Sequence, residues 1–77
     1  MDLRIKIKYL GYLTDLAGKQ YDELEINGNK KVEDLIPFLK KLRSDDYILI
    51  INGKGAKADT EVKDGDNIVV LPQTGGG

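Results

Sequence analysis

The sequence contains no cysteine and no histidine. Their absence excludes disulfide bonds, structural zinc sites, iron–sulfur ligation, and nucleophiles or bases built on a thiolate or an imidazole. Little of the usual catalytic repertoire remains.

An excess of one charge and a long apolar run are also lacking. Twelve basic residues face thirteen acidic ones, for a net charge of −1, so the chain has no basic excess for binding a phosphate backbone and we expect no nucleic-acid partner. No apolar run approaches the ~20 residues of a membrane span. Residues 1–10 alternate charged with apolar side chains, unlike the core of a signal peptide, so we expect a cytoplasmic protein without a membrane partner.

The chain has 77 residues, of which 40% are hydrophobic. This length fits one domain, because an average domain takes about 100 to 200 residues. A domain this small buries only roughly 60% of the surface of its unfolded chain, so its apolar residues must follow a regular pattern. The sequence predicts one small core and excludes a multi-domain enzyme.

Alternating side chains predict two strands near the start of the chain. Leu3–Tyr9 places four apolar residues on one side and Arg4, Lys6 and Lys8 on the other, which is typical of a half-buried strand with a solvated basic face. Tyr21–Ile26 alternates in the same way and ends in Asn27-Gly28-Asn29, which favours a turn. We expect these two strands to form a hairpin.

An apolar stripe with helical spacing runs from Val32 to Leu42, with acidic residues early and basic residues late, as the helix dipole prefers. Two residues are unfavourable for a regular helix here. Lys31 is a poor N-cap, and Pro37 removes a backbone donor inside the stripe. We therefore predict one main helix with a bend, preceded in the chain by a short helical turn within Leu10–Gly18 that packs over an edge of the core.

Two further strands complete the pattern. Tyr47–Ile51 is a continuous apolar run that ends in a turn, and Ile68–Leu71 is a second run that is stopped by Pro72. The order of elements predicts an α+β roll, in which the main helix covers one face of a mixed sheet of four to five strands. We expect this domain to span residues 1–72, followed by a flexible tail over residues 73–77.

Two motifs favour plain structural interpretations. Asp64 and Asp66 suggest a cation site, but the other ligands of a calcium loop are missing, so the Asp-Gly-Asp segment indicates a turn and no metal site. Leu71-Pro72-Gln73-Thr74-Gly75 matches the LPxTG pattern of sortase substrates. The signal peptide, membrane span and basic tail of a wall-sorting signal are absent, which leaves a chance match or an engineered tag.

Three glycines end the chain, and glycine is the residue that loses most entropy when it is ordered. Residues 72–77 reach up to roughly 20 Å when extended. A thin end of this kind suits a terminal carboxylate that must enter a narrow active site of another protein. A disordered terminus or a cloning remnant is the alternative.

The sequence resembles the sulfur-carrier family of molybdopterin synthase small subunits and thiazole-synthesis carriers. The resemblance spans nearly the whole chain and rests on segments in Ile5–Tyr9, Leu13–Gly18, Val32–Leu35, Leu49–Gly53, Lys63–Asp66, Leu71–Pro72 and Gly76–Gly77. It implies the ubiquitin-like β-grasp fold. Leu13–Gly18 and the length favour the molybdopterin branch, whereas Gln73-Thr74 and the third glycine depart from its usual ending.

The resemblance also implies the chemistry of the tail. An E1-like adenylyltransferase would use ATP to convert the carboxylate of Gly77 into an adenylate, and sulfur would then replace AMP to give a thiocarboxylate. Gly75 and Gly76 would carry the terminus into the active site of the partner. A sulfur-accepting synthase subunit would receive the sulfur. This chain would then be a carrier substrate rather than an enzyme, with no tightly bound cofactor of its own.

Two alternatives remain open at the level of sequence. A ubiquitin-like modifier would use the same adenylate but end as an isopeptide bond to lysines of target proteins. A non-covalent β-grasp interaction module would not need the glycines and would tolerate the loss of Gly76 and Gly77. Processing that exposed Gly76 would move the acceptor by one residue.

A docking surface follows from strand alternation, without the resemblance. If Leu49 and Ile51 point toward the helix, the outward positions on the last two strands carry Ile48, Ile50, Val69 and Leu71. An apolar patch on a small protein marks a partner site, here for a chain that is a monomer when free. Coverage of this patch by a second copy or by the Leu10–Gly18 segment is the alternative.

Overall fold

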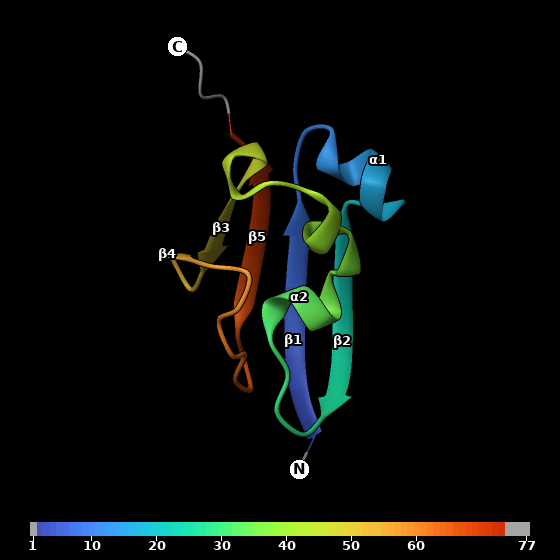
Figure 1. Ribbon diagram of the computed structural model, residues 1–77. Coiled ribbons are helices and arrows are strands. Elements are labelled where there is room, and N and C mark those ends of the chain that lie inside the picture. Colours follow the sequence, from blue (N-terminus) through green and yellow to red (C-terminus); the bar gives the residue numbers. More distant parts are fainter. Residues whose placement is uncertain (1, 74–77) are drawn as a thin grey trace.

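The computed structural model describes residues 2–73 and shows one five-stranded mixed sheet with short helices on one of its faces (Figure 1). The strands are β1 (Asp2–Tyr9), β2 (Tyr21–Asn27), β3 (Tyr47–Ile51), β4 (Lys54–Ala56) and β5 (Asn67–Pro72). Their order across the sheet is β2-β1-β5-β3-β4. The first and last strands thus lie side by side in the middle of the sheet.

The pairing of the strands confirms the mixed sheet. β1 and β2 form the expected antiparallel hairpin, with Ile5 opposite Leu24. β1 runs parallel to β5, with Ile7 opposite Ile68, and β3 runs antiparallel to both β5 and β4. Strand β4 was not expected, because its three residues, Lys-Gly-Ala, carry no apolar alternation.

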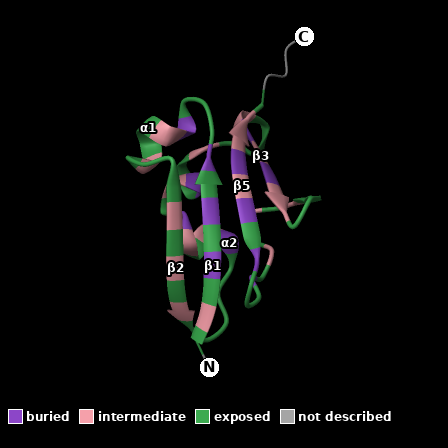
Figure 2. Cartoon of the chain, turned by 180° about the vertical axis from the view of Figure 1, so that it is seen from behind, coloured by how far each residue is buried: buried purple, intermediate pink, exposed green. Residues whose placement is uncertain are grey.

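The core lies between the sheet and the helices. The inward side chains of β1, β3 and β5 alternate with exposed or half-buried ones, as Figure 2 shows along β1 from behind. Twelve apolar residues form this core: Ile5, Ile7, Tyr9, Leu13, Val32, Ile36, Leu39, Tyr47, Leu49, Val62, Ile68 and Val70. Burial of this apolar surface is the main term that stabilises the fold.

The helical layer differs from the expected single bent helix. α2 spans only Val32–Leu35, and a separate 3₁₀ helix follows at Pro37–Lys41. Pro37 has no N–H to continue the α-helical ladder, and the preceding Ile36 adopts φ −126° and ψ 76°, outside the helical region. The bend predicted at Pro37 is thus a break between two short helices, and Ile36 and Leu39 of the apolar stripe still reach the core.

Lys31 precedes α2 without a side-chain cap, as its residue type predicts. Asp34 stabilises the start of α2 in place of a side-chain cap, because its carboxylate accepts a hydrogen bond of 3.0 Å from the N–H of Lys31. This bond and the nearby lysines lower the pKa of Asp34. A 3₁₀ helix at Ser44–Asp46 leads into β3, and α1 (Leu13–Ala17) is the expected short turn at the edge of the core.

Asp64 and Asp66 hold the turn before β5 and do not assemble a cation site. Asp66 is buried, and its carboxylate accepts hydrogen bonds from Asn52 Nδ2 at 2.8 Å and from the N–H of Lys63 at 2.7 Å. Asp64 accepts a bond of 2.8 Å from the N–H of Arg4. Within residues 2–73, no group of three or more Asp or Glu residues is arranged to hold a metal ion.

Candidate docking face and tail root

The face of the sheet that the helices leave uncovered carries the four predicted docking residues. Ile48 lies opposite Leu71, and Ile50 lies opposite Val69, in the antiparallel register of β3 and β5. All four side chains are partly exposed. Directly opposed side chains are about 5 Å apart at their Cβ atoms, so the structure brings the four together into one patch.

Leu10 also belongs to this patch, whereas its sequence placed it in the Leu10–Gly18 segment, the alternative cover for the patch. Its N–H donates a hydrogen bond of 3.0 Å to the carbonyl of Val70, which extends the parallel register of β1 and β5 by one step and sets Leu10 beside Leu71. Leu10 is 38% exposed. We call Leu10, Ile48, Ile50, Val69 and Leu71 the docking patch.

The patch is open at its β4 edge. Gly55 lies opposite Ile50 and carries no side chain, and a Cβ at Gly55 would meet nothing within 4 Å. The neighbouring strand would otherwise cover Ile50. Strand β4 therefore places no side chain beside Ile50 at this position.

The rest of the open face is charged. Lys6 lies opposite Glu23 and Arg4 lies opposite Glu25, so the basic row of β1 runs beside an acidic row of β2. Lys8 instead lies between Tyr21 and Val69, next to the docking patch. The face therefore changes from apolar at the end of β5 to charged at the opposite end, and the basic row is the solvated strand face that its sequence predicts.

The end of β5 is fixed by three contacts, which define the root of the tail. Pro72 packs against Gly11, whose φ of +59° only glycine adopts readily. The carbonyl of Asp46 accepts a hydrogen bond of 2.7 Å from the hydroxyl of Tyr12 and one of 3.4 Å from the N–H of Gln73. The chain therefore leaves the sheet at a set position, next to Leu71.

The predicted acceptor Gly77 and the predicted entry residues Gly75 and Gly76 lie outside the described residues. So do Thr74 and Gly75 of the LPxTG match, whereas its other three residues, Leu71, Pro72 and Gln73, fall within residues 2–73. The first two of these residues belong to β5 and pair with β3.

Two tyrosines on the inner face of the sheet have altered acidity. Burial, with a further contribution from the charge of Asp22, raises the pKa of Tyr9 to about 12. Burial and the charge of Glu33 raise the pKa of Tyr47. Both phenols stay neutral at physiological pH. Neither belongs to the docking patch.

A mixed sheet grasping a small helical layer, with an apolar face beside the root of the C-terminal segment, defines a ubiquitin-like β-grasp protein. The model of the ThiS family matches residues 7–77, and the chain belongs to this family. The resemblance to the sulfur-carrier family that the sequence indicated is thereby confirmed. No curated protein matches the chain.

Solved structures agree on the fold. A putative molybdopterin converting factor, subunit 1, from Pyrococcus furiosus is 29% identical, with a TM-score of 0.72 over 94% of this chain and 99% of the other. The small archaeal modifier protein 1 of Methanosarcina acetivorans is 25% identical, with a TM-score of 0.66 over 100% of this chain and 99% of the other. The ubiquitin of Caldiarchaeum subterraneum is 29% identical, with a TM-score of 0.58 over the whole of both chains.

These neighbours include both a converting-factor subunit and protein modifiers, and thus represent two uses of one fold.

Among residues 2–73, no helix is long and apolar enough to cross a membrane.

Proposed function

We propose that this chain is a small sulfur carrier that is activated at the carboxylate of Gly77. The observation that carries the proposal is the position of the tail root at the docking patch: β5 ends at Pro72 directly after Leu71, with five residues from there to Gly77. A partner that covers the patch therefore has the terminus within about 17 Å of its surface. Membership of the ThiS family supports the same function.

The chemistry requires two steps on partner enzymes. An E1-like adenylyltransferase joins the carboxylate of Gly77 to the α-phosphate of ATP, with release of pyrophosphate. A sulfide donor then attacks the carbonyl carbon, AMP leaves, and the C–S bond of a thiocarboxylate replaces the C–O bond. Gly75 and Gly76 suit a narrow entry channel because they have no side chains. ATP is used by the partner, and the carrier itself holds no cofactor.

A sulfur-accepting synthase subunit then receives the sulfur, in a molybdopterin-type or a thiazole-type pathway. The likeness to the converting-factor subunit of Pyrococcus furiosus favours the first. Catalysis resides in the partners, and this chain supplies the reactive terminus and the docking patch. It acts as a monomer when free, because a second copy on the patch would block the partner.

Intact mass spectrometry tests the proposal. The purified chain is incubated with ATP, a matched E1-like adenylyltransferase and a sulfide donor, beside a chain that lacks Gly76 and Gly77. We expect a mass gain equal to the replacement of one oxygen by sulfur, and no gain in the truncated chain. The enzyme must be shown to be active on its own carrier in parallel, so that a missing product counts against the proposal.

Conjugation to target lysines is the second candidate, and the likeness to small archaeal modifier protein 1 favours it. The adenylate is common to both functions, and they differ only in the nucleophile that replaces AMP. Adducts of this chain on lysines of other proteins would establish the modifier. If neither product forms, a non-covalent interaction module that uses the docking patch replaces both.

A further inference from the structure

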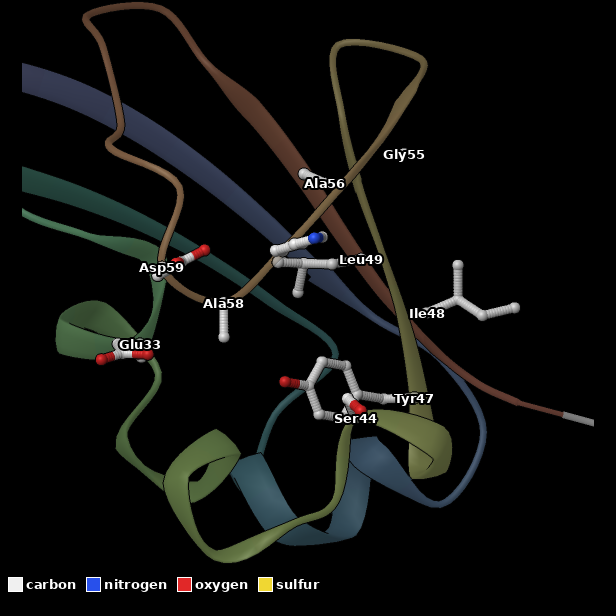
Figure 3. A pocket seen from close by; sticks show the side chains of 10 residues that line it. Glu33, Ser44, Tyr47, Ile48, Leu49, Gly55, Ala56, Ala58 and Asp59 are labelled. Carbon is white, nitrogen blue, oxygen red and sulfur yellow. The ribbon is translucent and has the colours of Figure 1, made fainter.

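A groove of about 740 Å³ opens along β3 and β4, and Ile48 is the one residue of the docking patch that also lines it (Figure 3). It exists because the helical layer is short: α2 ends at Leu35 and lies in front of β1 rather than β3 (Figure 1). Its floor is apolar and consists of Leu49, Ala56 and Ala58. None of the functions proposed above uses this groove.

Backbone hydrogen bonds hold one wall of the groove in place. The N–H of Glu33 donates to the carbonyl of Ala58 at 2.9 Å, and the N–H of Val32 donates to the carbonyl of Thr60 at 3.0 Å. These bonds tie the first turn of α2 to the segment after β4. The backbone segments that carry Glu33 and Asp59, both of which line the groove, are therefore held together.

Tyr47 places a polar atom between the floor and this wall. The residue is only 9% exposed, and its hydroxyl points into the groove toward the side of Glu33 and Ala58 (Figure 3). Among the described residues, this hydroxyl has no hydrogen-bond partner, whereas that of Tyr12 does. Among residues 2–73, no buried polar side-chain atom lacks a hydrogen-bond partner, so the oxygen of this hydroxyl is in contact with solvent and open to a ligand in the groove. Burial and the charge of Glu33 raise the pKa of Tyr47, so the group is a neutral phenol.

The charge of the groove is negative. Glu33 and Asp59 contribute two carboxylates and Lys57 contributes one ammonium. The ion pairs found within residues 2–73 are Lys19–Asp22 and Lys40–Asp34, so neither groove carboxylate is neutralised by a cation of the described chain. An apolar floor, two free carboxylates and an unpartnered hydroxyl match a cation on an aliphatic stem.

We propose that this groove receives a lysine side chain of a protein partner. The methylene groups of the lysine would lie on Leu49 and Ala58, as such stems do on apolar surfaces. Its ammonium has three N–H donors, which suit three acceptors from separate elements: Glu33, Asp59 and the hydroxyl of Tyr47. The groove shares only Ile48 with the docking patch, and this contact does not use the chemistry of the tail.

The test uses the ¹⁵N-labelled full chain, without any partner or tail chemistry. The probe is Nα-acetyl-lysine methylamide, and its matched control is the same compound with a neutral, acetylated side chain. We expect saturable shifts of the amide signals of Tyr47, Ala58 and Asp59 with the charged probe alone. The signals of Ile50 and Val69 on the docking patch should stay in place.

Variants assign the binding to the groove. Glu33→Gln and Asp59→Asn should each weaken the affinity for the probe about threefold, the order expected when one carboxylate contact is lost. Tyr47→Phe keeps the ring and should weaken binding as well. Glu25→Gln, which removes a carboxylate from the open face instead, should bind as the unaltered chain does. Unchanged thermal midpoints would show that the variants are folded.

Three results would overturn the proposal. Equal shifts with the neutral probe would show that the groove binds the apolar part of the probe and does not recognise its charge. Affinities that do not change in Glu33→Gln and Asp59→Asn would place the cation elsewhere. An absence of saturable shifts at the groove, with folded protein and millimolar probe, would show that it does not select an ammonium group.

Discussion

Pro72 leaves no room for a side chain on Gly11: a Cβ on Gly11 would lie 2.7 Å from the Cγ atom of Pro72. Gly11 also has a φ of +59°, so that a side chain there is strained regardless of the available space. The loop after β1 and the last residue of β5 are thus fitted to each other. This fit fixes where the tail leaves the sheet.

Replacement of Gly11 separates the effect of this contact from that of the backbone angle. Gly11→Ala should lower the free energy of unfolding by roughly 2 to 3 kcal/mol, because strain and overlap add. Gly18→Ala is the matched control, since Gly18 has a φ of +76° and nothing within 4 Å of its Cβ position. It should cost only about 1 kcal/mol. Urea unfolding measures both, and equal losses would show that the contact with Pro72 is unimportant.

A charge within the docking patch should block the activating enzyme. Val69→Arg should lower kcat/KM for adenylylation at least about tenfold, because it puts a charge into an interface that buries apolar side chains. Asn67→Arg is the control on the same strand and the same face, two residues toward the charged end, and it should act almost as the unaltered chain. Circular dichroism would verify that both are folded. Similar rates for the two variants would mean that the patch is not the contact surface.

The raised pKa of Tyr9 predicts a loss of stability at alkaline pH. Its pKa is about 12 in the folded chain and about 10 when unfolded, so the folded state retains the proton longer. Below pH 10 the stabilising effect is fully present. As the pH rises from 10 to 12, the unfolded state ionises first, and stability falls by on the order of 2 kcal/mol.

Tyr9→Phe cannot ionise and should lose less stability over the same range. The measurement is urea unfolding of both chains from pH 8 to 12, with the difference at pH 8 as the reference. Part of the slope should remain in the variant, because the pKa of Tyr47 is also raised. A difference between the two chains that does not change with pH would contradict the assignment.

Asp66 should matter far more to stability than its neighbour Asp64. Asp66→Ala leaves the donors on Asn52 and Lys63 without their acceptor in a buried place, at a cost of roughly 2 to 3 kcal/mol. Asp64→Ala removes one exposed bond to Arg4 and should cost under about 1 kcal/mol. Thermal unfolding of the two variants gives the comparison. A calcium-dependent midpoint in the unaltered chain would instead revive the cation site.

The strands were predictable because each carries its own alternation. The start of the helix at Val32 was also predicted. Pro37 ends the α-helix instead of only bending it, and this was not apparent from the apolar stripe, because the 3₁₀ helix after Pro37 still brings Leu39 to the core. The four expected patch residues follow from alternation on single strands. Leu10 does not, because its position depends on the parallel pairing of β1 with β5, which joins segments about sixty residues apart.

The groove could not be found from the sequence for a related reason. Its walls combine Glu33, Tyr47 and Asp59, which come together only after the helix has ended early and β4 has turned back. No local pattern marks such a site. In the sequence, Tyr47 has the pattern of an ordinary strand residue, and only the structure shows that its hydroxyl faces the groove.

The central place of β5 has a further consequence for quality control. Because β5 bridges β1 and β3, the sheet cannot close until the last strand of the chain has been synthesised and inserted. Pairing across such a separation forms late in folding. Insertion of β5 therefore completes both the docking patch and the anchor of the tail. An activating enzyme that binds the docking patch would thus bind only chains whose sheet has formed.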